Sequence, residues 1–87
     1  MPVYVAERHL PGITLERLTA VQMAALEMSR RFTAEGKPVR YLRSVFVPSE
    51  SHCLSLFEAE SAALVRDVNE AAQISFTRIV EALDLTP

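Results

Sequence analysis

Two kinds of apolar periodicity alternate along this chain of 87 residues, and their order constrains the fold more than any other feature. One stretch has the spacing of a long amphipathic helix, which begins after Thr14 and ends at Gly36 and Pro38. Its apolar members recur at steps of three and four: Leu15, Leu18, Val21, Ala25, Met28 and Phe32. Strand-forming residues precede this helix and follow it, so the chain mixes helices and strands.

Four segments predict strands, at residues 2–9, 39–47, 52–59 and 76–83. A second helix, rich in alanine, begins after Ser61, and the polar turn at 48–51 makes a hairpin of the middle strands. With right-handed crossovers, this order gives a ferredoxin-like α+β sandwich, a four-stranded antiparallel sheet with two helices on one face. We expect a single domain over residues 1–87, with the first and third strands central and parallel.

Both faces of the predicted sheet carry large apolar side chains, although the helices can cover only one of them. A chain of this length buries roughly 60–65% of its unfolded surface, so its stability margin is narrow. We therefore expect the uncovered face to meet the same face of a second copy, as in a homodimeric α/β barrel. The residues expected on this uncovered face are Glu7, His9, Tyr41, Arg43, Cys53 and Ser55.

Charge and composition exclude several classes of function. Lysine and arginine number 9 against 11 aspartate and glutamate, and a net charge of −2 argues against a nucleic-acid-binding surface. No apolar run approaches the ~18 residues of a membrane span, and the first ten residues lack a secretory-signal pattern. Cys53 has no second cysteine to pair with, which fits a reducing compartment. We expect a cytoplasmic protein that binds neither nucleic acid nor membrane.

His9 is the first candidate for a metal ligand. It ends the first predicted strand, and Glu7 shares its face. Parallel alignment of the first and third strands would place His9 level with Glu58 and Glu60. An imidazole near carboxylates suits a first-row divalent metal, or a general base held by an acid. The alternative is an exposed histidine at the end of a strand.

The adjacent His52 and Cys53 are the second candidate. Neighbours in a regular strand point to opposite faces, so these two can hold one ion only if they lie in the turn before the strand. Thiolate and imidazole ligands favour nickel, copper or zinc over calcium. The alternative is a buried, inert cysteine beside a solvated histidine. The full set of candidate metal ligands is Glu7, His9, His52, Cys53 and Glu58.

Tyr41 and Arg43 indicate a site for a small-molecule ligand. In a regular strand both lie on one face, and Ser55 on the third strand adds a hydroxyl. Arginine offers a planar fork for carboxylate or phosphate, and tyrosine a hydroxyl. The alternative is an ion pair of Arg43 with Glu7 or Glu81 of another subunit.

Three short motifs carry a resemblance to a known family: YVAERH at residues 4–9, followed by Pro11, YLRS at 41–44 and SLFEAES at 55–61. They are similar to a small bacterial family of ferredoxin-like proteins of unknown function, the DUF4242-like family, which includes nickel-binding proteins. The resemblance implies a ferredoxin-like fold, a dimer, and binding of Ni²⁺ or another first-row divalent metal, with His9 as the metal-competent residue.

The chain departs from the family pattern at two places. A cysteine often stands in the family where this chain has Ser55, and a hydroxyl is a poor nickel ligand. The second helix usually ends in Ala-Gly, where this chain has Ala72 and Gln73.

Three functions are consistent with the sequence. The first, favoured by the resemblance, is a protein that sequesters or buffers nickel. The second is a cofactor-independent monooxygenase, isomerase or cyclase with an apolar pocket between sheet and helices. Its base would be His9 or Glu7, and Arg43 or Tyr41 would polarise an oxygen. The third is an interaction module that uses the uncovered face of the sheet.

Overall fold

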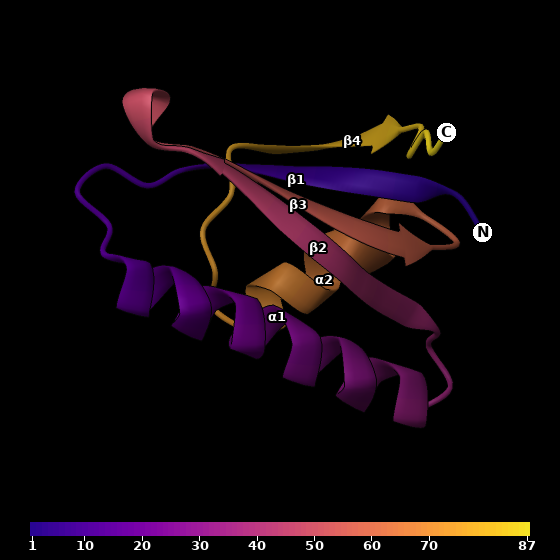
Figure 1. Ribbon diagram of the computed structural model, residues 1–87. Helices are drawn as coiled ribbons and strands as arrows, with labels where there is room; N and C mark the ends of the chain where they lie inside the picture. The colour runs from indigo at the N-terminus through magenta and orange to yellow at the C-terminus, as the bar shows by residue number, and fades with distance from the viewer.

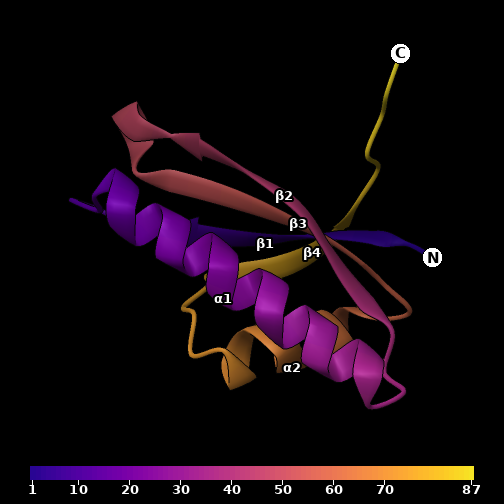
Figure 2. The same ribbon diagram turned by 60° about the horizontal axis from the view of Figure 1, so that its bottom comes forward.

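In the computed structural model, which describes residues 1–87, strands and helices follow one another in the predicted order (Figure 1). The strands are β1 (Val3–His9), β2 (Val39–Val47), β3 (His52–Ala59) and β4 (Arg78–Ala82). The helices are α1 (Leu15–Ala34) and α2 (Ala62–Ala71), and both lie on the same side of the sheet (Figures 1 and 2). This arrangement is the predicted ferredoxin-like α+β fold. Neither helix is long and apolar enough to cross a membrane.

The strand order in the sheet is β2-β3-β1-β4, so β1 and β3 are central as predicted. The prediction that they run parallel was wrong, because they pair antiparallel, with Val3 opposite Glu58 and His9 opposite His52. The reason is the short turn at Pro48–Glu50, which reverses the chain between β2 and β3. The consequence is that His9 lies beside the first residue of β3, at the opposite end of that strand from Glu58.

Both helices begin at the predicted caps. The Oγ1 of Thr14 accepts a hydrogen bond from the backbone N–H of Arg17, and the Oγ of Ser61 accepts one from Leu64. These side chains satisfy backbone donors that the first turn of a helix leaves unpaired. The sequence therefore fixes where each helix starts.

The core lies between the helices and one face of the sheet. Small residues on the central strands, Ala6 and Ala59, let the helices approach closely, and both are fully buried. From α2, Val65 and Val68 pack against that face with no exposed surface. Phe57 of β3 fills the middle, with its ring centroid 5.4 Å from that of Tyr41.

The strands alternate between this covered face and the open face, as we call the sheet face turned away from the helices. On β1, Glu7 and His9 lie on the open face as predicted, whereas Arg8 is buried under the helices. On β3 the prediction was wrong, because Cys53 and Ser55 are buried on the covered face. The open face carries Val3, Val5, Glu7, His9, Arg40, Arg43, Val45, Val47, His52, Leu54, Leu56, Glu58, Arg78, Val80 and Ala82.

A β-bulge in β2 separates two residues that the sequence placed together. The register shifts between Tyr41, which pairs with Phe57, and Arg43, which pairs with Leu56. The extra residue, Leu42, reverses the alternation, so Tyr41 points to the covered face and Arg43 to the open face. The prediction that they share a face was therefore wrong.

Candidate metal site

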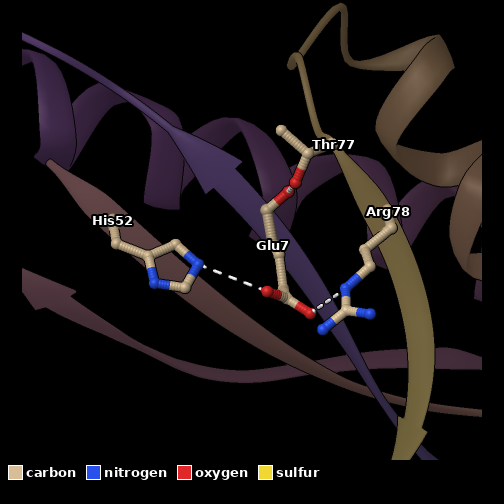
Figure 3. A network of polar contacts seen from close by, with 4 residues as sticks. All are labelled: Glu7, His52, Thr77 and Arg78. Carbon is tan, nitrogen blue, oxygen red and sulfur yellow. Dashed lines mark hydrogen bonds and ion pairs between the residues drawn. The ribbon is translucent and has the colours of Figure 1, made fainter. Parts of the chain in front are cut away.

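Glu7 is the centre of a polar network at one end of the open face (Figure 3). Its Oε1 lies 3.3 Å from Nε2 of His52 on β3, and its Oε2 accepts a hydrogen bond of 2.5 Å from Nε of Arg78 on β4. The Glu7 side chain is only 15% exposed. A largely buried carboxylate on the central strand is thus held from both neighbouring strands.

Thr77 fixes the backbone beneath this network. Its N–H and its Oγ1 both donate to the backbone oxygen of Glu7, at 2.7 and 3.0 Å. These bonds hold the start of β4 against β1, so that Arg78 lies directly opposite Glu7 in the register. The pairing of the two side chains therefore follows from the backbone.

The Glu7–His52 pair has the separation that two ligands of one metal ion need. Metal–nitrogen and metal–oxygen bonds of about 2.0–2.2 Å at angles of roughly 90–110° place the two donor atoms roughly 2.9–3.5 Å apart. The observed distance of 3.3 Å between Nε2 and Oε1 lies in that interval. An ion could therefore take both ligands without a rearrangement of the backbone.

His9 is the nearest further ligand. It is exposed and lies directly opposite His52 in the β1–β3 register. Side chains at such cross-strand positions have Cβ atoms about 4.5–5.5 Å apart, so rotation can bring both rings together. No group of three His, Cys, Asp or Glu side chains is already arranged to hold an ion. One chain thus places two potential ligands side by side, with a third potential ligand on the neighbouring strand position.

Two of the predicted metal ligands lie elsewhere. Glu58 is at the far end of β3, where its Oε1 lies 3.8 Å from Nε of Arg40. Cys53 is buried on the covered face, with Sγ 3.9 Å from the Oγ of Ser55, whereas His52 points to the open face. The structure therefore brings together Glu7, His9 and His52 and leaves Glu58 and Cys53 apart from them.

The predicted ligand-binding residues also divide between the two faces. Under the helices, a hydroxyl chain runs from Tyr41 to Ser44 at 2.6 Å and from Ser44 to Ser55 at 2.8 Å. Arg43 lies on the open face and forms an ion pair with Asp84. Glu7 and His9 face away from the helices, so neither of these expected bases lies in a pocket between sheet and helices with Tyr41; Arg43 shares their face.

Arg8 continues the hydroxyl chain, and sequence reasoning gave it no role. The residue is 0% exposed and donates to Ser55 Oγ at 3.3 Å, to Asn69 Oδ1 at 2.7 Å and to the Ser75 carbonyl at 3.1 Å. No carboxylate pairs with it. Burial lowers the pKa of Arg8, and the nearby Cys53 opposes that shift. The signal was the alternation of Tyr4, Ala6 and Arg8, which puts an arginine on an apolar face.

Comparison with known proteins identifies relatives of this chain. A family model described as "Nickel responsive protein SCO4226-like" matches residues 4–82. Among solved structures, that of SCO4226 from Streptomyces coelicolor A3(2) superposes with a TM-score of 0.81 and 21% sequence identity. The alignment covers 97% of this chain and 99% of that one, which shows the shared fold. The description of the family model supports the nickel-related family that the sequence resembles, but not the name DUF4242. No curated protein sequence matches the chain.

Proposed function

Because the chain belongs to the SCO4226-like family, whose model is described as that of a nickel responsive protein, we propose that it binds Ni²⁺ through Glu7 and His52, joined by His9. One observation carries the proposal. The 3.3 Å contact between Glu7 and His52 is the one place in the chain where a histidine and a carboxylate lie within 4 Å. Imidazole and carboxylate are ligands that nickel accepts. The proposed role is to sequester or buffer the ion.

The proposal includes a homodimer formed through the open face. Three protein ligands leave coordination positions that water or a second copy must fill. The centre of the open face is apolar, which favours a second copy as the partner. Its apolar members come from all four strands: Val5, Val45, Leu54, Leu56 and Val80.

The segment after β4 supports the same arrangement. It leaves the sheet on the side away from the helices (Figure 2). Its two leucines, Leu83 and Leu85, are 81% and 83% exposed. The Asp84 carboxylate between them pairs with Arg43 on the opposite edge strand, which draws the segment over the open face. A second copy packed there would bury both leucines.

We also propose a cytoplasmic location. The support is Cys53, which is free and buried. An unpaired cysteine is the ordinary state in a reducing compartment.

Calorimetric titration with Ni²⁺ at neutral pH tests the metal site. We expect Glu7→Gln and His52→Ala each to weaken nickel binding by about tenfold or more, with a smaller loss for His9→Ala. The matched controls are Glu58→Gln, the same change on the same face, and Cys53→Ser. Equal affinity in all five variants, or a loss confined to the two controls, would rule out this site.

A further inference from the structure

We infer that a cavity between α1 and β2 binds a small carboxylic acid with an apolar body, at a place separate from the metal site. The cavity has a volume of about 540 Å³. That volume lies within the roughly 300–1,000 Å³ of small-molecule pockets. Its apolar wall includes Leu26 of α1 and Val39 and the ring of Tyr41 from β2. The metal-site residues Glu7, His9 and His52 do not line it.

Ser29 gives this cavity an unused hydrogen-bonding group. The residue lines the cavity and is only 2% exposed, yet its Oγ has no hydrogen-bond partner. A serine inside a helix ordinarily turns to solvent or bonds to the carbonyl four residues earlier, and Ser29 does neither. One turn later Thr33 is fully used, since its Oγ1 both donates to and accepts from the backbone of Val39. This buried hydroxyl has no partner within the protein, and an oxygen atom of a ligand in the cavity is the partner that we infer for it.

The charges around the cavity select an anion. Arg30 from α1 lines it on the helix side, and Arg40 and Glu58, which lie opposite each other on the open face, form its rim beyond the edge of β2. Arg30 forms no ion pair, and Arg40 is 72% exposed with its Nε 3.8 Å from Glu58. Guanidinium groups bind carboxylates in a planar, bidentate manner. The ligand that fits is therefore an apolar acid whose carboxylate meets Arg30 and offers an oxygen to Ser29.

Titration of ¹⁵N-labelled protein with decanoate tests the inference, with decan-1-ol as an uncharged molecule of the same length. We expect decanoate to cause saturable chemical-shift changes at the amides of Leu26, Ser29 and Val39, and decan-1-ol to bind about tenfold more weakly. Shifts confined to the open face, no saturation at millimolar decanoate, or equal binding of the alcohol would each overturn it.

Two variants separate a ligand site from a structural role. Ser29→Ala should weaken decanoate binding about fivefold without lowering the melting temperature of the free protein, because the hydroxyl has no partner there to lose. Arg30→Gln should cause a similar loss of affinity, and the control Arg66→Gln on the exposed side of α2 should cause none. Wild-type decanoate affinity in both Ser29→Ala and Arg30→Gln would contradict the inference.

Discussion

At the scale of single residues, Arg8 is the side chain on which the covered face most depends. It is a buried cation without a counter-ion, and neutral acceptors satisfy it: Ser55 on β3, Asn69 on α2 and the Ser75 carbonyl beyond α2. Burying a charge is costly unless hydrogen bonds compensate for it. These three bonds therefore join the sheet to the second helix.

We expect Arg8→Lys to lower the free energy of unfolding by about 3 kcal/mol, because one ammonium cannot span acceptors on three elements as a guanidinium does. Urea denaturation followed by circular dichroism measures the loss. The control is Arg66→Lys, the same change at an exposed position of α2, which should move the midpoint very little.

The stability that Arg8→Lys loses relative to the wild type should become smaller as the pH rises. Burial lowers the pKa of Arg8, but a guanidinium stays protonated in proteins, so the wild type gains no stability from this group between pH 7 and 10. A buried lysine has a lowered pKa, so the folded variant binds fewer protons than its unfolded chain, and its stability rises with pH. The gap between wild type and Arg8→Lys should therefore narrow from pH 7 to 10. A constant gap would show that the substituted amine is not desolvated.

Arg8 also explains why residue parity on β3 could not be predicted. Alternation correctly grouped Cys53 with Ser55, but it does not say which group faces the helices. We expected both on the open face. In the structure these small side chains lie beside the buried guanidinium, which the sequence pattern of β3 alone does not reveal. Because Cys53 lies on the covered face, it is separated from the other candidate metal ligands Glu7, His9 and His52, which share the open face.

At the scale of the elements, the β2 bulge is an insertion that can be removed. Deletion of Leu42 leaves Tyr41 opposite Phe57 and Arg43 opposite Leu56, now in regular alternation. We expect the deletion variant to fold with a stability within about 1 kcal/mol of the wild type. Thermal and urea unfolding measure it.

Deletion of Val45 from the same strand is the control variant for the Leu42 deletion. It shifts Phe46 from the covered face to the open face or, if the bulge slips, turns Arg43 toward the core. Either outcome should destabilise the fold severely. Similar stabilities for the two deletion variants would mean that the bulge does not determine which side chains of β2 point to the covered face.

Both helices end in a Schellman motif, but with different residues at the left-handed position. After α1 this is Gly36, with φ of +86°, and after α2 it is Gln73, with φ of +59°. The backbone bonds are equivalent, from Lys37 to Phe32 and from Ile74 to Asn69.

Gln73→Gly should therefore raise the free energy of unfolding by about 0.5–1 kcal/mol, because glycine adopts this conformation without steric cost. Denaturant titration is precise enough to detect the gain. Gln73→Ala provides the comparison and should give no increase, since alanine has the same Cβ. A gain in both variants would point to the glutamine side chain instead of the backbone.

At the scale of the whole molecule, the proposed homodimer depends on the apolar centre of the open face. Leu56→Glu would bury a carboxylate there, so we expect this variant to be monomeric where the wild type is dimeric. Sedimentation equilibrium at micromolar concentration measures the masses. The matched control is Leu15→Glu on exposed α1, which should stay dimeric. A monomeric wild type would contradict the dimer and leave the Glu7–His52 pair as a single-chain site.

The architecture could be predicted from the sequence because each element carries its own signal. The spacing of apolar residues predicts the two helices, and the capping residues Thr14 and Ser61 and the terminal Gly36 mark where they begin or end. The order of helices and strands then allows only a few topologies. Strand facing could not be predicted as well, because it depends on one inserted residue, Leu42, and on the buried Arg8. The direction of β3 did follow from the hairpin predicted at residues 48–51, but β1 and β3 were nevertheless expected to run parallel. The expected pairing of His9 with Glu58 failed for that reason.

The ion pair between Arg78 and Glu7 has a consequence for which metal ions the proposed site would select. Arg78 holds Oε2 of Glu7 at 2.5 Å, whereas the proposed ion would bind Oε1, so a cation bound there would be repelled by the nearby guanidinium. Sodium, which binds carboxylates weakly, would gain too little there to offset that repulsion. A transition-metal ion that also bonded the imidazole of His52 would gain a second, softer ligand, and this bond would offset the repulsion from Arg78. At the proposed nickel site, Arg78 would therefore disfavour hard monovalent ions such as sodium relative to a transition-metal ion.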